Sequence, residues 1–135
     1  MATNQQILDR AAYELGYLDA GGSLGATDAA DALAAYNSMM HRWKQEDKDF
    51  NWFTQDTLGD TAPIPVWAED GVISSLARRL STVFSVAPSA QLVQDARDGE
   101  RTIANRLINE KLEGTDMSHL PLGSLGSRYD IETDN

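Results

Sequence analysis

The stretch between residues 27 and 47 carries apolar side chains at helical spacing, and this stripe constrains the fold most strongly. Thr27 or Asp28 is placed to cap a helix that we expect to run to about Asp47. A helix with one apolar face has to bury that face, so we interpret the stripe as core and not as a cofactor site. Its members recur every three or four residues: Ala29, Ala32, Leu33, Tyr36, Met39, Met40 and Trp43.

The segments on either side of this helix are also predicted to be helical. Thr3 and Gln6 have the spacing of a capping box, which predicts a first helix over residues 4–16. Pro65 is suited to the position just before a third helix, because its missing N–H costs nothing there. That helix is expected to end before Pro88, since proline disfavours the helical conformation in the preceding residue.

A fourth helix is predicted over residues 90–112, with Ser89 as its cap and Gly114 at its end. Gly99 falls inside this helix, where a glycine costs about 1 kcal/mol relative to alanine. We therefore expect Gly99 to mark a close helix crossing or a bend. Together the four segments predict an all-α fold, with a four-helix bundle-like domain over residues 1–114.

The connection between the second and third predicted helices is long and aromatic. Its alternating residues predict a short β-hairpin that pairs Phe50–Thr54 with Thr61–Val66, confined to an edge by Pro63 and Pro65. A loop of this length is unusual for a mere connection. We expect it either to fold over the helices or to present its aromatic residues to a partner, namely Phe50, Trp52 and Phe53.

Residues 115–135 differ in kind from the preceding chain. They contain Pro, Gly and Ser, and their apolar residues do not recur at a regular spacing. The segment formed by the last six residues is acidic. Such a composition does not bury enough surface to order itself, yet its leucines and tyrosine suit a contact. Two interpretations stay open, a frayed terminus and an extended arm that orders on another subunit, and we favour the arm. Its expected contact residues are Leu120, Leu122, Leu125, Arg128 and Tyr129.

The charge of the chain narrows the classes of partner. The 135 residues include 21 Asp and Glu against 11 Lys and Arg, a net charge of −10. Tight non-specific DNA binding needs many Lys or Arg contacts to phosphate, so gripping nucleic acid is disfavoured, as is an anionic membrane. The sequence contains no run of 18 apolar residues, so we expect no membrane span. Residues 1–6 are polar, so we expect no signal peptide.

Motifs for catalysis and metal binding do not occur in the sequence. There is no cysteine, which excludes disulfides, a thiol nucleophile and thiolate zinc. His41 near Glu46 and Asp47 matches no recognised metal spacing, and no phosphate-binding glycine loop or nucleophile elbow occurs. With 21 carboxylates some pair is always close, so an acid/base hydrolase is the least favoured class. We expect a non-enzymatic protein without cofactor or metal.

Arg97 and Arg101 share one face of the fourth predicted helix, because residues four apart are neighbours on a helix surface. Two interpretations stay open. The first is ordinary surface charge. The second is an arginine row that docks on the carboxylates of an acidic partner, such as a second copy of this acidic chain.

Two lines of residues resemble a known family by their order and spacing. The first is L-x-x-x-N-x-M-M-x-x-W over residues 33–43. The second is P-x-W over residues 65–67, followed by L-A-x-x-L over residues 76–80. Over residues 7–112 the chain resembles the head–tail adaptor, or packaged-DNA-stabilisation, proteins of tailed bacteriophages, especially short-tailed ones.

The chain departs from that family at two turns. Residues 46–48 read Glu-Asp-Lys where the family usually has a glycine after the helix-closing tryptophan. Residues 84–85 read Phe-Ser where an aromatic–glycine pair is usual.

The resemblance implies an all-helical structural protein of the virion, located at the head–tail interface and made in the host cytoplasm. Such adaptors form a ring, typically dodecameric, beneath the portal of a filled capsid. They extend the DNA channel, retain the packaged genome and offer a platform for the tail. The implied partners are the portal, tail or nozzle proteins and copies of the chain, while DNA passes through without specific binding.

The same resemblance assigns expected roles to the candidate residues. The arm of residues 115–135 would reach the portal, and the aromatic loop would dock the tail. An alternative from another class also fits the charge and the lack of catalytic motifs. It is a small, acidic, helical regulatory protein that sequesters a basic partner.

Overall fold

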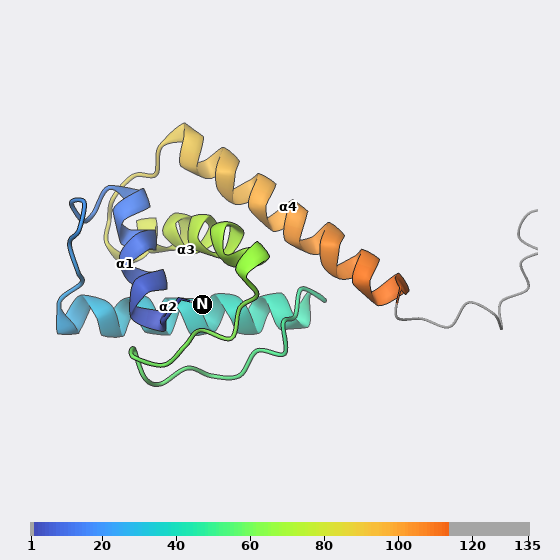
Figure 1. The fold of residues 1–135 in the computed structure, drawn as a ribbon. Coiled ribbons are helices and arrows are strands. Elements are labelled where there is room, and N and C mark those ends of the chain that lie inside the picture. The colour runs from blue at the N-terminus through green and yellow to red at the C-terminus, as the bar shows by residue number, and fades with distance from the viewer. Residues whose placement is uncertain (1, 114–135) are drawn as a thin grey trace, which may run out of the picture.

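The computed structural model describes residues 2–113, so the predicted arm of residues 115–135 lies outside the described part. The described part contains four α-helices and one short 3-10 helix and no strand, which confirms the all-α prediction. None of the described helices is long and apolar enough to cross a membrane. In chain order the elements are α1 (Asn4–Leu15), α2 (Ala26–Gln45), η1 (Val66–Ala68), α3 (Glu69–Val83) and α4 (Ala90–Glu113) (Figure 1).

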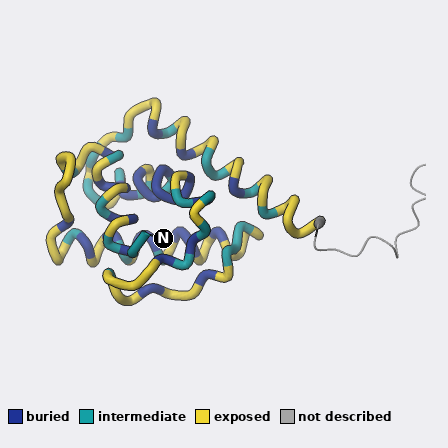
Figure 2. Tube along the Cα trace, viewed as in Figure 1, coloured by how far each residue is buried: buried dark blue, intermediate teal, exposed yellow. Residues whose placement is uncertain are grey.

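Helix α3 is the central element and contacts each of the other three helices. Helix α4 runs diagonally over α3, and its C-terminal end projects beyond the body of the molecule (Figure 1). Burial along α4 follows this course: Leu92, Ala96 and Ile103 are buried, whereas Ile108 and Leu112 are exposed (Figure 2). The first part of α4 therefore belongs to the core, and its last turns stand free of it.

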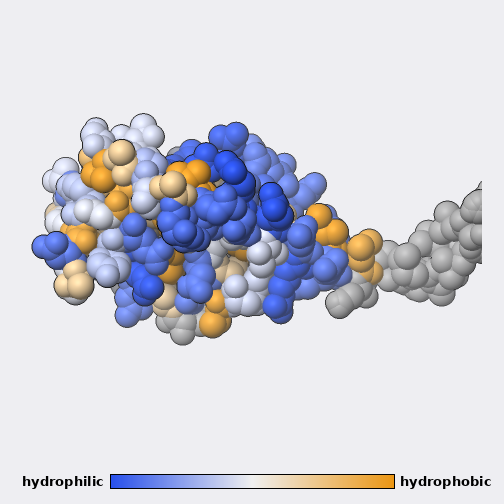
Figure 3. Space-filling view, turned by 90° about the horizontal axis from the view of Figure 1, so that it is seen from above, coloured by the Kyte–Doolittle hydropathy of each residue, from blue (hydrophilic) through white to orange (hydrophobic). Residues whose placement is uncertain are grey.

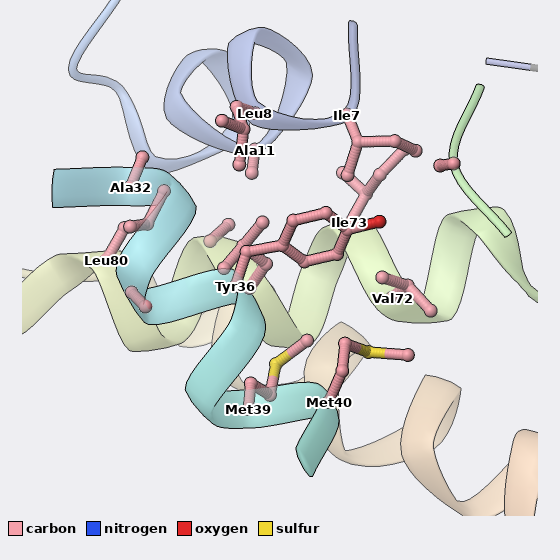
Figure 4. Packing of buried hydrophobic residues seen from close by; sticks show 14 of the residues in the cluster. Ile7, Leu8, Ala11, Ala32, Tyr36, Met39, Met40, Val72, Ile73 and Leu80 are labelled. Atoms are coloured by element: carbon pink, nitrogen blue, oxygen red, sulfur yellow. The ribbon is translucent and has the colours of Figure 1, made fainter. Parts of the chain in front are cut away.

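The core is built on the stripe that the sequence predicted for α2. Six of its seven members are buried, and Leu33 is packed against them at the edge. Figure 4 shows Tyr36 of α2 among side chains from α1 and α3, including Ile7, Leu8 and Val72. Burying one side chain of this size stabilises the fold by roughly 1.5–3 kcal/mol. The interpretation of the stripe as core is confirmed.

The helix ends agree with the predicted caps in two places. The Thr3 hydroxyl accepts a hydrogen bond from the Gln6 N–H at 3.2 Å, and the Gln6 side chain accepts one from the Thr3 N–H at 2.9 Å. The Ser89 hydroxyl accepts from the Leu92 N–H at 3.0 Å. The predicted cap of α2 is wrong: the cap residue is Gly25, which has no side chain to signal the start.

Replacing Thr3 with alanine is expected to lower the free energy of unfolding by about 1 kcal/mol, because the hydroxyl that accepts from the Gln6 N–H is lost, while the backbone N–H of residue 3 can still donate to the Gln6 side chain. Thr27→Ala is the matched control, since Thr27 is exposed in the first turn of α2 and caps nothing. Urea unfolding followed by circular dichroism measures both. Equal losses in the two variants would contradict the assignment of the cap.

The predicted hairpin between α2 and α3 is wrong for the described chain. Residues 50–54 contain no strand, and Thr61 forms an isolated antiparallel bridge with Thr3. The reason lies in Asn37 of α2. Its side chain donates to the Gln55 carbonyl and accepts from the Gln55 N–H, both at 2.9 Å. These bonds hold the chain on α2 directly after residues 50–54. Within those residues the Trp52 carbonyl accepts from Lys44 of α2 at 3.2 Å and the Trp52 N–H donates to Asp49 at 3.0 Å, so neither group is left for a neighbouring strand.

Helices α3 and α4 cross at two glycines. A Cβ atom on Gly99 would lie 2.7 Å from the Cα of Gly71, and one on Gly71 would lie 3.0 Å from the Gly99 carbonyl oxygen. A separation of 2.7 Å is shorter than a van der Waals contact, so a side chain at Gly99 would force the two backbones apart. The prediction that Gly99 marks a close crossing is confirmed, and the structure adds Gly71 as the other side of it.

Candidate interaction surface

The predicted pair Arg97 and Arg101 lies on a surface to which α3 also contributes. One hollow of about 310 Å³ is lined by Arg97, Arg101 and Arg78. A second hollow of about 370 Å³ adjoins it, shares Arg78, and is also lined by Arg79 and by Arg42 of α2. We call the surface formed by Arg78, Arg79, Arg97 and Arg101 the arginine face.

The four residues of the arginine face make no ion pair within the described part of the chain. Cations elsewhere are engaged. Arg10 pairs with Glu14 at 3.0 Å, Lys44 donates to the Trp52 carbonyl at 3.2 Å, and Arg106 lies 4.4 Å from the Trp67 ring centre. The described arginines whose side chains have no partner at all therefore lie on one surface of a chain of net charge −10.

Two carboxylates border the arginine face, and both are already bound. Lys48 pairs with Glu46 at 2.9 Å and with Glu100 at 3.2 Å. The hydrogen bond from Lys48 and a second from Arg42 lower the pKa of Glu46 below its usual value. Burial alone would lower the pKa of Lys48, but its bonds to Glu46 and Glu100 raise it overall. Glu100 lines both hollows and Glu46 lines the larger one, but neither carboxylate forms an ion pair with an arginine of the arginine face.

The three aromatic residues predicted to form a docking loop occupy different environments. Trp52 is only 2% exposed and packs edge-on against Tyr36, with ring centres 4.9 Å apart. Phe50 is half-buried and packs edge-on against Trp67 at 5.7 Å. Phe53 is 63% exposed. The expectation for Trp52 needs correction, because its indole fills the core; of the three, Phe53 is the residue that a partner could reach fully.

The arm residues Leu120, Leu122, Leu125, Arg128 and Tyr129 lie outside the described residues. Ile108 and Leu112 are exposed near the end of α4, the last described element before the predicted arm. Figure 3 shows hydrophobic atoms close to the point where the described chain ends, beside a strongly hydrophilic surface. The described chain thus presents apolar surface where the arm begins.

Titratable groups inside the described part do not gather into a site with recognisable chemistry. No group of three or more His, Asp or Glu side chains within residues 2–113 is placed to hold a metal ion. His41 is exposed and hydrogen-bonds the Thr54 hydroxyl at 3.0 Å. Burial, and then the charge of Glu69, raise the pKa of Tyr36, so this core hydroxyl stays protonated.

Sequence reasoning found half of the arginine face. Arg97 and Arg101 are recognisable as neighbours on one helix, whereas the addition of Arg78 and Arg79 depends on how α3 crosses α4. The contact of Gly71 with Gly99 fixes that crossing. Arg97 and Arg101 each lie two residues from Gly99, and Arg78 lies about two helical turns from Gly71. A paired small residue on the third helix is the signal that could have located the complete face.

No protein-family model matches the sequence, and no curated protein matches it at a significant level. The resemblance to head–tail adaptors therefore rests on the order and spacing of the motifs in the sequence.

Proposed function

We propose that the chain is a structural virion protein, a head–tail adaptor of a tailed bacteriophage. Its bundle-like domains form a ring under the portal that extends the DNA channel, retains the packaged DNA and carries the tail. The observation that supports this proposal best is the arginine face on a strongly acidic chain. Such a face is complementary to carboxylates elsewhere on a second copy, and contacts between unlike faces form a ring when the rotation from copy to copy closes.

The charge of the chain also suits a channel through which DNA passes. A ring around DNA must surround it without holding it, and a net charge of −10 per copy repels phosphate. At physiological salt this repulsion extends about 8 Å from a wall. We place the arginine face between neighbouring copies, where its charge is neutralised and does not retard DNA.

The portal contact is assigned to the arm of residues 115–135. Its apolar residues would occupy crevices of the portal, with Arg128 paired to an acidic rim. The exposed Phe53 lies on another part of the chain and is our candidate for the tail side. Repetition around a ring converts weak contacts of this kind into tight binding. The portal residues in this assignment are Leu120, Leu122, Leu125 and Tyr129.

Deleting residues 115–135 is expected to abolish binding to the portal while leaving helicity intact. The reason is that the described core lies wholly within residues 2–113. Circular dichroism measures the helicity, and co-sedimentation with purified portal rings of the same phage measures the binding. If the shortened chain still sediments with the portal, the arm does not make the contact.

Reversing one charge in the arginine face is expected to weaken ring formation at least tenfold. Arg101→Glu would place a carboxylate where the neighbouring copy presents its own, and like charges across an interface cost several kcal/mol. Arg10→Glu is the control, because it changes the net charge equally on α1, outside the arginine face, and loses only an exposed ion pair with Glu14 that contributes little to stability. Analytical ultracentrifugation in the presence of portal compares the two. Equal assembly of both variants would remove the arginine face from the interface.

The alternative function is sequestration of a basic partner by a small acidic helical protein. The net charge of −10 favours it as much as it favours an adaptor. The arginine face speaks against it, since four arginines without carboxylate partners would repel a basic surface. This alternative would be supported if the chain formed a one-to-one complex with a basic protein and did not bind portal rings.

A further inference from the structure

We infer that the arginine face is the docking site for the acidic end of its own chain, residues 130–135. This inference goes beyond the proposed function, because it names a ligand within the same molecule and requires neither a portal nor a ring. The segment reads Asp-Ile-Glu-Thr-Asp-Asn, with an acid at every second position. Charge, spacing and reach each support the pairing.

The charge on the two sides is complementary. Arg78, Arg97 and Arg101 are exposed, Arg79 is half-buried, and none of them pairs with a carboxylate in the described chain. Two adjoining hollows, of about 310 and 370 Å³, lie between these side chains. Guanidinium groups bind carboxylates through paired hydrogen bonds, which are stronger than those between neutral groups. A short segment with three carboxylates is therefore the chemistry that this surface recognises.

The spacing of the charges also agrees. In an extended backbone, alternate residues point to the same side and are about 6.6 Å apart. Residues four apart on a helix, such as Arg97 and Arg101, are about 6 Å apart along the axis. An extended segment lying along α4 can thus present Asp130 and Glu132 to this pair. Asp134 would then be next in line for a further arginine of the face.

The chain is long enough for the segment to return to its own domain. Arg101 lies 12 residues before Glu113 at the end of α4, which is about 18 Å along the helix. Residues 114–129 provide 16 residues, and extended chain of that length reaches about 53 Å. A tethered ligand has an effective concentration in the millimolar range, above that of free copies in solution. The intramolecular contact is therefore favoured over the same contact in a second copy.

Docking has a consequence for assembly that rests on the proposed function. A docked segment covers the surface that we assign to the contact between neighbouring copies. The segment and the neighbour then compete for the same arginines, so free copies in solution would stay apart until the segment is released. The docking of residues 130–135 does not depend on this effect on assembly.

The test measures where residue 135 lies in the 135-residue chain in solution. Because the chain has no cysteine, Asn135→Cys provides a single site for a nitroxide spin label. We expect the label to broaden the amide signals near Arg97, Arg101 and Arg78 beyond detection in an isotope-labelled sample. Signals of α1, which lies on another side of α3, should be broadened less than those around the arginines, and this gradient serves as the internal control. Equal intensities with active and reduced label throughout α3 and α4 would overturn the inference.

Charge exchange shows whether the contact depends on the named residues. Arg97→Glu with Arg101→Glu should restore the broadened signals, with helicity unchanged by circular dichroism. Adding Asp130→Lys, Glu132→Lys and Asp134→Lys to that variant should bring the broadening back. Broadening that survives the arginine changes, or fails to return with the lysines, would overturn the assignment of the face.

Isotope dilution separates the chain's own segment from that of a second copy. Spin-labelled chains without isotope are mixed with isotope-labelled chains without spin label. No broadening is expected in this mixture if the contact is intramolecular. Broadening around the arginine face would show that the ligand comes from a second copy and would overturn the intramolecular contact. Because no portal is present, these outcomes are independent of those that test the adaptor.

Discussion

Replacing Trp52 with alanine is expected to lower the free energy of unfolding by about 3–5 kcal/mol, as for other large aromatic residues removed from a core. The indole is 2% exposed and packs edge-on against Tyr36 of α2. Its loss leaves a cavity next to the fully buried Tyr36 ring. The segment around residue 52 would also lose its apolar anchor to α2. Urea unfolding followed by circular dichroism measures the change.

Phe53→Ala is the matched control, because Phe53 is the next residue in the chain and is 63% exposed. Its substitution should change the free energy of unfolding by no more than about 0.5 kcal/mol, as is usual for surface positions. The pair of variants separates an aromatic residue that holds the loop on the core from one that is available to a partner. A larger loss for Phe53→Ala than for Trp52→Ala would contradict the described packing of the loop.

Replacing Gly99 with valine is expected to lower the free energy of unfolding by about 3 kcal/mol. Even a single Cβ atom at this position would lie 2.7 Å from the Cα of Gly71. The backbone of α3 cannot move aside as a flexible side chain would, so α4 has to shift away. This cost exceeds the gain in helix propensity from removing a glycine, which is below about 1 kcal/mol.

Gly59→Ala provides the control for Gly99→Val. A Cβ atom on Gly59 meets nothing within 4 Å, and no unusual backbone conformation is required there. Its effect should stay within about 0.5 kcal/mol. The Gly99 variant should in addition weaken any binding by the arginine face, because Arg97 and Arg101 move with α4. A Gly99→Val protein as stable as Gly59→Ala would show that the helices do not cross at this contact.

The helices were predictable because their signals are local. The apolar stripe of α2, the capping box of Thr3 and the cap at Ser89 each lie within a few residues of the structure they determine. The start of α2 was missed for the same reason. Gly25 caps it without a side chain, while Thr27 and Asp28 nearby carry the residue types that usually cap helices.

The connection between α2 and α3 was not predictable, because its structure depends on contacts that are distant in sequence. The Asn37 side chain bonds both backbone groups of Gln55, and Thr61 pairs with Thr3. An asparagine on the polar side of a helix gives no indication of which backbone it will bind. Apolar and polar residues alternate over residues 49–52, and this pattern predicts a strand. In the structure Trp52 is apolar because it fills the core, and the segment forms no strand.

The arginine face was predictable in part, more than the connection between α2 and α3 and less than the helices. The pairing of Arg97 with Arg101 follows from helical spacing alone, and it was predicted. Their association with Arg78 and Arg79 requires the crossing of α3 and α4, which two glycines determine across 28 residues of sequence. Surfaces that combine two helices become predictable only once their register is known.

Imaging the 135-residue chain mixed with purified portal rings encoded by the same genome tests the central claim most directly. The adaptor proposal predicts a rotationally symmetric layer of chains on one end of the portal, coaxial with its channel and leaving that channel open. Two-dimensional class averages from electron microscopy are sufficient to see this layer. Portal rings that remain bare at chain concentrations well above stoichiometric would contradict the proposal.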